Sequence, residues 1–344
     1  MTTHSWPEVL TALIGGTDLS SSQTAWAMSE ILAGAATPAQ VAGFAVALRA
    51  KGETIDELEG LVAAMYQHAT PLPVTGRVLD VVGTGGDRSM SVNISTMAAI
   101  TAAAAGAPVV KHGNRSASSA AGAADVLEAL GIRLDLPAAA VARIGEQAGI
   151  TFAFAAAFHP ALRHAAAPRR ELGVRTTFNL LGPLAHPARP AAQAIGCADL
   201  AMAPLMAGVF ARRGVDAWVF RGDDGLDELT TTTTSQVWAV TDGGVSEFVV
   251  DPARFGVGGG TAEGLRGRDV TYNAEVVRRV VAGETGQVRD AVVLNAGAAL
   301  AVHAAEEGSH DDRLAAGIQR ATAALDSGRA QATLDRWVAV SSSA

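Results

Sequence analysis

The sequence predicts an α/β protein, with a small N-terminal helical domain plus a large α/β domain whose central, largely parallel sheet is flanked by helices. Helical patterns occupy residues 5–70, short apolar strands alternate with helices after residue 77, and polar, glycine-containing loops follow two of those strands. Of the 344 residues, 49% are hydrophobic but only 5% are aromatic, a mixture that suits helices packed on a sheet better than an all-β sandwich.

The helical domain, residues 1–72, is predicted from the signals that start its helices. The serines at 20–22 can cap one helix, Thr37 precedes a proline at the first position of the next, and Thr54 opens a third. Residues 71–73 read Pro-Leu-Pro, which cannot continue a helix and therefore marks a linker.

The α/β domain, residues 73–344, is predicted from an alternation of strand, loop and helix. We expect strands over 78–82, 151–155 and 218–220, a strand ending at 109–110, and helices over 93–105 and 123–130. The longest apolar stretch, residues 97–110, is too short to span a bilayer and is interpreted as a buried helix running into a strand. After residue 260 we expect further alternating helices and strands.

The composition excludes several classes of protein. A formal net charge of −8 argues against a general binder of nucleic acid or anionic membranes. The single cysteine, Cys197, excludes an internal disulfide framework, and its apolar neighbours predict a buried, inert thiol. Residues 1–10 lack the basic and apolar segments of a signal peptide. We therefore expect a cytoplasmic protein that binds neither nucleic acid nor membrane.

The first candidate site is the segment 83–87, Gly-Thr-Gly-Gly-Asp, directly after the first strand of the α/β domain. Glycines let the backbone approach a ligand closely, and successive N–H groups can form a nest for an anion. The segment is neither a Walker loop, because no Gly-Lys-Ser/Thr follows, nor a dinucleotide fingerprint, because the glycine spacing differs. It predicts a phosphate-binding loop, with a plain structural turn as the alternative.

Two further polar elements follow in the sequence. Residues 91–96, Ser-Val-Asn-Ile-Ser-Thr, offer hydroxyl and amide ligands for phosphate or metal-bound water at a predicted helix start. The alternative is simple helix capping by Asn93 or Ser95, and the two interpretations can hold together. Residues 111–115, Lys-His-Gly-Asn-Arg, supply positive charge and donors at a strand end, and a serine-rich stretch continues to Ser119. In an acidic protein, such a basic loop indicates an anion site. His112 on its own could be a core histidine.

The fourth element is the acidic segment 224–228, Asp-Gly-Leu-Asp-Glu, at the end of another strand. Adjacent carboxylates suit Mg²⁺, which binds through few carboxylates and keeps waters and phosphate oxygens as its other ligands. Alone, the segment could be a surface turn; beside two phosphate-type loops, it predicts a metal site. The five threonines at 230–234 either support this acidic turn or form a plain polar loop or edge strand.

The fifth element combines the His-Pro segment starting at His159, the basic segment starting at Arg169, and residues 179–184, Asn-Leu-Leu-Gly-Pro-Leu. Its arginines and histidines indicate recognition of a second anion, with a solvated basic face as the alternative. A zinc site is disfavoured, because His159 and His164 are five residues apart and no suitable third ligand is near.

These five elements, in this order, resemble the anthranilate phosphoribosyltransferases of tryptophan biosynthesis, within the nucleoside phosphorylase-like phosphoribosyltransferases. The resemblance covers nearly the whole chain, starting from the helical segment 45–54, Ala-Val-Ala-Leu-Arg-Ala-Lys-Gly-Glu-Thr. It implies a glycosyltransferase that moves the 5-phosphoribosyl group of PRPP (5-phosphoribosyl 1-diphosphate) to the amine of anthranilate. It also implies Mg²⁺, two ions per active site, and an active site in the cleft between the two domains. About residues 165–185 would join the helical domain in space, and the helical domains would form a homodimer.

The resemblance implies a role for each matching residue. Those implied to bind PRPP are Gly83, Gly86, Asp87, Ser91, Asn93, Ile94, Ser95, Thr96, Lys111, His112, Gly113, Asn114, Arg115, Ser116, Ala117, Ser118, Ser119 and Ala123. Those implied to face anthranilate are Gly83, Asn114, His159 and Arg169, of which Arg169 can pair with a carboxylate. Those implied for Mg²⁺ are Ser95, Asp227 and Glu228. The motifs contain no Ser-His-Asp or Cys-His arrangement, so we expect catalysis by positioning and metal, without an acid or base residue.

The sequence departs from the family pattern near the phosphate loops, at Arg88, Val92, Ala120 and Ala123. Two other functions remain open at this point. A pyrimidine nucleoside phosphorylase resembles the same fold but uses free phosphate and a nucleoside; the acidic pair and the Asn-Ile-Ser-Thr run favour PRPP. A non-catalytic nucleic-acid-binding relative is disfavoured by the net charge of −8 and by the retained pair Asp227 and Glu228.

Overall fold

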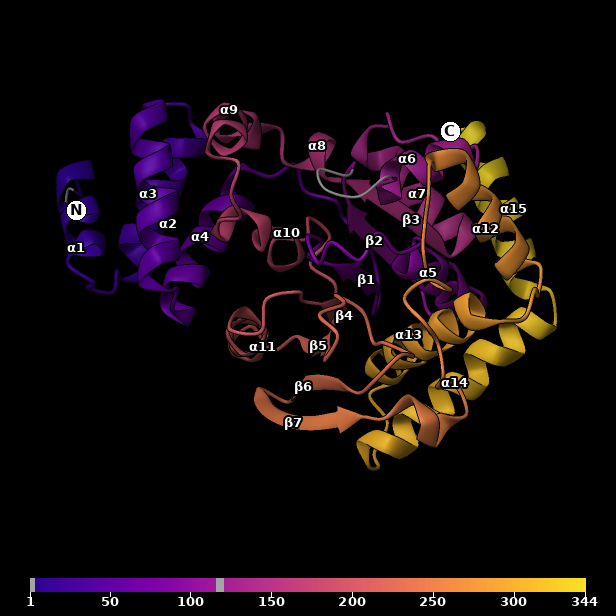
Figure 1. Cartoon of the computed structure of the whole chain (residues 1–344). Helices are drawn as coiled ribbons and strands as arrows, with labels where there is room; N and C mark the ends of the chain where they lie inside the picture. The colour runs from indigo at the N-terminus through magenta and orange to yellow at the C-terminus, as the bar shows by residue number, and fades with distance from the viewer. Residues whose placement is uncertain (1–3, 116–120) are drawn as a thin grey trace. The chain divides into compact units, whose positions relative to one another are not determined.

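The computed structural model describes residues 4–115 and 121–344. The chain divides into two compact units: unit 1 comprises Met1–Pro71 and Ala155–Pro187, and unit 2 comprises Leu72–Phe154 and Ala188–Ala344. Figure 1 labels the helices and strands of both units. None of the helices within the described ranges has the length and apolar content that crossing a bilayer requires.

Unit 1 is helical, as the sequence predicts. Its α-helices are α1 (Trp6–Ile14), α2 (Ser21–Leu32), α3 (Pro38–Lys51), α4 (Ile55–His68), α8 (Ala155–Phe158), α9 (Arg163–Leu172) and α10 (Leu181–Leu184), and short 3₁₀ helices cover Pro160–Leu162 and Thr177–Asn179. The predicted start signals are confirmed, because Ser20, Thr37 and Thr54 each accept a hydrogen bond from the backbone N–H three residues later.

The later segment of unit 1 is fixed to its first helices by polar contacts. The Thr177 hydroxyl donates to Glu53 Oε1 at 2.5 Å, the Tyr66 hydroxyl donates to the Leu184 carbonyl at 3.2 Å, and the Thr70 N–H donates to the Phe158 carbonyl at 2.8 Å. These contacts join parts of the chain more than 80 residues apart, so unit 1 is a single packed body built from two segments.

Unit 2 is the α/β domain that the sequence predicts. Its strands are β1 (Leu79–Gly83), β2 (Val109–Gly113), β3 (Ile150–Phe154), β4 (Ala192–Gly196), β5 (Asp216–Gly222), β6 (Ser235–Thr241) and β7 (Gly244–Val250). Its helices are α5 (Ile94–Ala104), α6 (Ala123–Ala129), α7 (Ala138–Ala148), α11 (Met202–Arg212), α12 (Val270–Val281), α13 (Gln287–Ala304), α14 (His310–Asp326) and α15 (Arg329–Ser342), and a 3₁₀ helix covers Pro252–Phe255.

Within the described residues, these strands form one seven-stranded sheet in the order β3-β2-β1-β4-β5-β6-β7. The first five are parallel, whereas β6 and β7 continue the sheet as an antiparallel hairpin. Helices α5 and α13 pack against the parallel strands, and α11 packs on β5 and β6, on the side away from α13 in Figure 1. The largely parallel sheet flanked by helices is therefore confirmed.

Two predictions of local structure were wrong. The strand expected to end at 109–110 continues through Gly113, because Lys111, His112 and Gly113 pair in register with residues of β3. The polar sequence resembled a loop, but the residues lie inside the sheet. After residue 260 the described chain holds helices α12 to α15 and no strand. The valine-rich and alanine-rich runs there have helical spacing and cover the sheet instead of joining it.

Candidate active site

The glycine loop follows β1 directly and is fastened to the neighbouring strand β4. The Thr84 N–H donates to the Gly196 carbonyl at 2.9 Å, and the Ala198 N–H donates to the Thr84 hydroxyl at 3.2 Å. Gly85 and Gly86 have φ values of +73° and +80°, a backbone conformation that residues with a side chain adopt only at a cost. The predicted loop therefore turns at the carboxyl edge of the parallel sheet, where ligands of such folds bind.

The acidic segment lies against this glycine loop. The Gly85 N–H donates to Asp227 Oδ2 at 2.6 Å. A Cβ atom on Gly83 would stand 2.2 Å from the same oxygen, and one on Gly196 would stand 1.5 Å from the Asp227 backbone oxygen. The two strand-end glycines therefore provide the space through which Asp227 reaches the loop. Gly196 was not predicted as a site residue, because its contact with Asp227, far away in the chain, depends on the tertiary fold.

Three carboxylates converge at this point. Each of Asp87, Asp227 and Glu228 offers a ligand oxygen, and these oxygens all lie within 4.8 Å of one another. Asp227 and Glu228 are only 6% and 8% exposed. The structure thus brings together the predicted acidic pair and also Asp87, which the sequence analysis assigned to PRPP and not to metal. Asp87 lies near Asp227 and Glu228 because it ends the glycine loop, which packs against the acidic segment.

The electrostatics of this cluster fit a divalent cation. Burial raises the pKa of the Glu228 carboxyl well above its usual range, and the charges of Asp227 and Asp87 raise it further, whereas Lys111 lowers it. Asp87 Oδ2 and Glu228 Oε2 are buried and accept no hydrogen bond from the described residues. Carboxylates this close repel one another, and a cation among them removes the repulsion. The donor set suits Mg²⁺, which combines few carboxylates with water and phosphate oxygens.

The threonine run supports the acidic turn. The Thr230 and Thr232 hydroxyls both donate to Asp224 Oδ2, at 2.7 and 2.5 Å, and the Thr234 hydroxyl donates to Asp223 Oδ2. Of the two interpretations that the sequence left open, support of the turn is therefore confirmed. The Asp224 carboxylate accepts these threonine hydrogen bonds, whereas Asp227 and Glu228 belong to the carboxylate cluster.

Lys111 brings a positive charge beside the carboxylates. It is 1% exposed, and its ammonium donates to the Val81 carbonyl at 2.5 Å and to the Ser95 hydroxyl at 3.3 Å. Burial lowers the pKa of the Lys111 ammonium to about 8, and the nearby carboxylates, led by Asp80, oppose this effect. A buried ammonium next to an acidic group provides the positive half of a site for a metal–phosphate complex.

The start of α5 is held by residues that the sequence analysis did not identify. Asn93 precedes the helix, but its side chain does not cap it; Nδ2 donates to the Ala121 carbonyl and Oδ1 accepts from Asn273 Nδ2. A Cβ atom on Gly267 would stand 2.7 Å from the Ser91 carbonyl. No sequence signal links residues near 270 to the motif at 91–96, because the contact depends on the tertiary fold. Ile94 and Thr96 are buried, with exposed fractions of 0% and 1%.

The other predicted residues of unit 2 lie around β2. His112 is 3% exposed, and its backbone N–H donates to Asp80 Oδ1 at 3.0 Å. Gly113 ends the strand, and a Cβ there would stand 3.8 Å from the Cβ of Ala123. The Arg115 guanidinium binds carboxylates of α6, with Glu128 at 2.5 and 2.9 Å. Asn114 lies between Gly113 and Arg115, and its carbonyl accepts from the Ala124 N–H.

Four residues predicted to bind PRPP lie outside the described residues: Ser116, Ala117, Ser118 and Ser119.

Two predicted residues belong to unit 1. The Arg169 guanidinium, near the end of α9, lies over the Phe178 ring at 5.5 Å from its centroid, and burial lowers the pKa of this guanidinium. His159 is 4% exposed; burial lowers the pKa of its imidazole to about 4, against a hydrogen bond with the Ala185 backbone, and the nearby His186 lowers it further. His159 is therefore neutral at pH 7, and Arg169 is the charged group of this pair.

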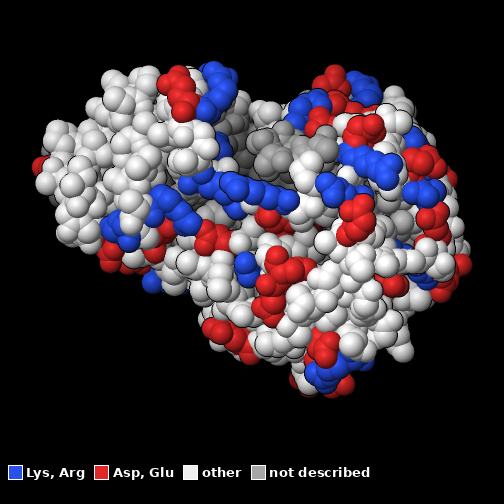
Figure 2. All heavy atoms as spheres, viewed as in Figure 1, with Lys and Arg blue, Asp and Glu red and all other residues white. Residues whose placement is uncertain are grey.

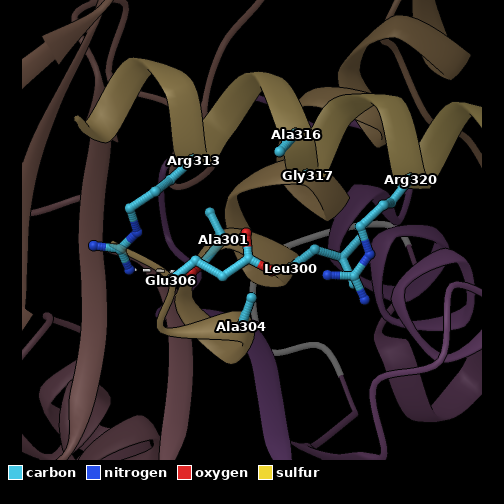
Figure 3. Close-up of a pocket in the computed structure, with 8 residues that line it drawn as sticks. All are labelled: Leu300, Ala301, Ala304, Glu306, Arg313, Ala316, Gly317 and Arg320. Carbon is cyan, nitrogen blue, oxygen red and sulfur yellow. Dashed lines mark hydrogen bonds between the residues drawn. The ribbon is translucent and has the colours of Figure 1, made fainter. Parts of the chain in front are cut away.

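Unit 2 also contains a small pocket. Figure 3 shows it between α13 and α14, with Arg313 and Arg320 extending from α14 and Arg313 donating to the Ala301 carbonyl. Its volume of about 10 Å³ is room for about one water molecule. None of the candidate site residues lines it, so it is not the substrate site.

Comparison with known proteins identifies the relatives of this chain. A family model described as "Glycosyl transferase family, helical bundle domain" matches residues 7–69, and one described as "Glycosyl transferase family, a/b domain" matches residues 75–331. The chain is 70% identical to the anthranilate phosphoribosyltransferase of a Nocardioides species, over 97% of this chain and 98% of that protein. It is 57% identical to that of an Arthrobacter species, over 98% and 96%.

Solved structures agree with these matches. The anthranilate phosphoribosyltransferase of Thermus thermophilus superposes with a TM-score of 0.91 at 40% identity, covering 97% of this chain and 99% of that chain. The Saccharomyces cerevisiae enzyme in complex with PRPP and Mg superposes with a TM-score of 0.90 at 25% identity, covering 98% of both chains. With its two family models and these full-length relatives, the chain belongs to this glycosyl transferase family and, within it, to the anthranilate phosphoribosyltransferases.

Proposed function

We propose that this protein transfers the 5-phosphoribosyl group of PRPP to the amine of anthranilate, giving N-(5-phosphoribosyl)anthranilate and diphosphate, in tryptophan biosynthesis. The observation that carries the proposal is the convergence of Asp87, Asp227 and Glu228, with ligand oxygens within 4.8 Å, at the glycine loop ending a parallel strand. Carboxylates suit Mg²⁺ that is also bound by phosphate oxygens, and close backbone donors suit the phosphates. The names of full-length relatives support the same reaction.

In this proposal, the residues of unit 2 hold PRPP. The loop glycines Gly83 and Gly86 allow close approach of the backbone, and Lys111 pairs with phosphate charge. Asp87, Asp227 and Glu228 hold Mg²⁺, with Ser95 as a further ligand and two ions per active site. When bound, Mg²⁺ would neutralise the charge that develops on the leaving diphosphate.

The remaining predicted contacts complete the PRPP site. They are Ser91, Asn93, Ile94, Thr96, His112, Gly113, Asn114, Arg115 and Ala123, together with the serine-rich segment that follows. Since Ile94 and Thr96 have buried side chains, they would bind through backbone groups. Arg115 would act mainly by fixing the loop to α6, because its guanidinium is already engaged by Asp125 and Glu128.

Anthranilate is recognised, in this proposal, by Gly83, Asn114, His159 and Arg169. The Arg169 guanidinium pairs with the substrate carboxylate, a charge-assisted contact for which arginine is well suited. The amine nitrogen attacks C1 of the ribose with its lone pair while the bond from C1 to the diphosphate oxygen breaks and that oxygen keeps the electron pair. The proton displaced from nitrogen passes to solvent. The protein aligns the two substrates and stabilises the leaving charge.

We further propose that residues 1–72, joined by about 165–185, form the helical domain and that residues 73–344 form the catalytic domain. The active form would be a homodimer made through the helical domains, working in the cytoplasm. Mass photometry of the purified protein, with one species at twice the mass of 34.9 kDa, would support the dimer, and a single monomer peak would contradict it.

The experiment that tests the reaction is incubation with PRPP, MgCl₂ and anthranilate while the fluorescence of anthranilate is followed. Fluorescence should fall only when all three are present, and EDTA should stop the fall. Release of thymine or uracil from a nucleoside and free phosphate, without use of anthranilate, would instead show a pyrimidine nucleoside phosphorylase. A shift of labelled DNA would point to a nucleic-acid-binding relative. The net charge of −8 disfavours it, and the face in Figure 2 carries acidic as well as basic side chains.

A further inference from the structure

We infer that Asn295, in the middle of helix α13, is a positioning residue for the metal-binding pair Asp227 and Glu228. Its side chain holds the backbone of Leu229, the residue that directly follows the pair. The inference rests on the proposed function, since it assigns Asn295 its role through the carboxylates that would bind Mg²⁺.

The contact consists of two hydrogen bonds to the same residue. The Leu229 N–H donates to Asn295 Oδ1 at 2.9 Å, and Asn295 Nδ2 donates to the Leu229 carbonyl at 2.8 Å. A side-chain amide presents a donor and an acceptor side by side, which matches the N–H and C=O of one backbone residue. The carboxamide therefore takes the place of a neighbouring strand for one residue of backbone.

The segment that carries the pair needs such a support. Residues 226–230 belong to no helix or strand, so no regular backbone pairing fixes them. On the N-terminal side, the Gly222 N–H donates to the Leu226 carbonyl at 2.9 Å. On the C-terminal side, Asn295 holds Leu229, and the Ser235 hydroxyl accepts from the Thr230 N–H at 3.0 Å. Asp227 and Glu228 thus lie between two points at which hydrogen bonds fix the backbone, Leu226 before them and Leu229 after them.

Asn295 lies in a buried, apolar environment, so its hydrogen bonds to Leu229 are not an incidental surface contact. Asn295 is 1% exposed and lies in a helix whose other residues from Ala291 to Val302 are buried and apolar or glycine. Burying an amide among them is costly unless its polar atoms are paired. They are paired: besides the Leu229 bonds, Nδ2 donates to the Ala291 carbonyl at 2.9 Å.

The position of Glu228 depends on this contact through the peptide geometry. Leu229 follows Glu228 through one planar peptide bond, so a displacement of the Leu229 N–H moves the Glu228 backbone with it. On the other side, Asp227 passes the two strand-end glycines with no room for adjustment, since a Cβ on Gly196 would meet its backbone oxygen. Loss of the amide would release only the Glu228 end and so widen the spacing of the carboxylates.

The test compares Asn295→Ala with a control, Leu300→Ala. Leu300 lies in the same helix and is 0% exposed, and its side chain cannot form hydrogen bonds to the acidic segment. Binding of Mn²⁺ in the presence of PRPP is measured from the EPR signal of the free ion, and thermal unfolding is recorded for each variant. We expect Asn295→Ala to weaken Mn²⁺ binding by about 10- to 100-fold and to raise the KM for PRPP, with the KM for anthranilate unchanged. Leu300→Ala should lower the melting temperature and leave Mn²⁺ affinity within about twofold of the parent.

A double-mutant cycle gives the second readout. If Asn295 acts through the pair, Asn295→Ala should weaken Mn²⁺ binding much less in a Glu228→Gln background than in the parent. Should Asn295→Ala not fold, Asn295→Leu, which is close in size and has no donor, acceptor or charge, is measured in its place. The positioning role would be overturned if the effects of the two substitutions on Mn²⁺ affinity were additive, or if a folded Asn295 variant bound Mn²⁺ like the parent. It would also be overturned if Leu300→Ala lost as much Mn²⁺ affinity, or if neither Asn295 variant folded. A parent protein that neither binds Mn²⁺ with PRPP nor consumes anthranilate would instead overturn the proposed function.

Discussion

The backbone oxygen of Asp227 lies 1.5 Å from the point where a Cβ atom on Gly196 would stand. An alanine there cannot be accommodated without moving the backbone that carries the acidic pair, because no side-chain rotation can relieve the contact. We expect Gly196→Ala to cost about 1–3 kcal/mol of stability, as overpacking does, and to reduce kcat/KM for PRPP at least about tenfold. Denaturant unfolding and steady-state kinetics measure the two effects.

Gly43→Ala is the matched control. Gly43 lies in helix α3, and a Cβ there would meet only Leu10 side-chain carbons at 3.6 and 3.9 Å, an ordinary contact. Replacing a helical glycine by alanine should stabilise unit 1 by about 0.5–1 kcal/mol and leave kcat/KM unchanged. Parental activity in Gly196→Ala would show that the acidic segment can shift freely, contrary to the packing.

The second prediction concerns Asp227→Asn combined with Glu228→Gln. Without metal, the buried carboxylates repel one another, so neutral amides should raise the melting temperature of the EDTA-treated protein. The same variant should bind Mn²⁺ poorly and turn over at least about 100-fold more slowly, because it lacks the metal ligands. A higher melting temperature together with slower turnover would indicate that the two carboxylates bind metal. Asp135→Asn, at an aspartate whose side chain is 85% exposed, should alter neither, and near-normal turnover of the double variant would contradict the metal assignment.

The third prediction uses the pH dependence of stability. Burial lowers the pKa of His159 to about 4, below its ordinary value of 6.5, so the unfolded state takes up a proton at a higher pH than the folded state. Stability from this group is therefore complete above pH 6.5 and is lost as the pH falls toward 4. Between pH 7 and 5 the parent should lose about 2 kcal/mol more than His159→Gln. Parallel stability curves for the two proteins would show that His159 is accessible to protons in the folded state.

The fourth prediction separates the two substrates. Arg169→Ala should raise the KM for anthranilate about 10- to 150-fold, the equivalent of a charge-assisted hydrogen bond of about 1.5–3 kcal/mol, with a much smaller change for PRPP. Arg170→Ala, next in the same helix and exposed, is the control and should leave both constants near parental values. An equal rise in the KM for PRPP would place Arg169 at the phosphate end.

Local signals in the sequence predicted much of the fold. Ser20, Thr37 and Thr54 start helices as expected because capping depends on residues only three positions apart. The end of β2 was missed because Lys111 and His112 are polar in sequence, although pairing with β3 places them in the sheet. Burial of a lysine is decided by its partners, the Val81 carbonyl and the Ser95 hydroxyl, and neither is adjacent in sequence.

For the candidate site, too, local motifs could be predicted from the sequence and contacts between distant segments could not. The glycine loop and the acidic pair were visible as motifs because each occupies a few consecutive residues. The residues that hold these segments and the start of α5 in place, Gly196, Asn295 and Asn273, carry no motif, because each contacts a segment far away in the chain. A single asparagine in an apolar helix gives a weak signal, a buried polar group in need of partners, and only the fold reveals what those partners are.

The last prediction is that no residue acts as an indispensable general base. The amine of anthranilate is an aryl amine, unprotonated at neutral pH, and metal-bound diphosphate is a good leaving group, so proton removal need not precede attack. The one histidine of the phosphate motifs, His112, is 3% exposed within β2, where its backbone N–H is bound by Asp80. We expect His112→Asn to lower kcat by about tenfold or less, against about 10²–10⁴ for the loss of a true base.

The pH profile of kcat provides the deciding comparison for His112→Asn. Parent and variant should both show a flat kcat between about pH 6.5 and 7.5, a range in which a histidine base would titrate. Above this range Lys111, whose pKa is about 8, would lose its charge in the enzyme without bound substrate. Since kcat reports the substrate-bound enzyme, and bound phosphate favours the charged lysine, only kcat/KM for PRPP should decline above pH 8. A parental step in kcat near pH 6.5–7, absent from a variant that is about 10³-fold slower, would establish a histidine base.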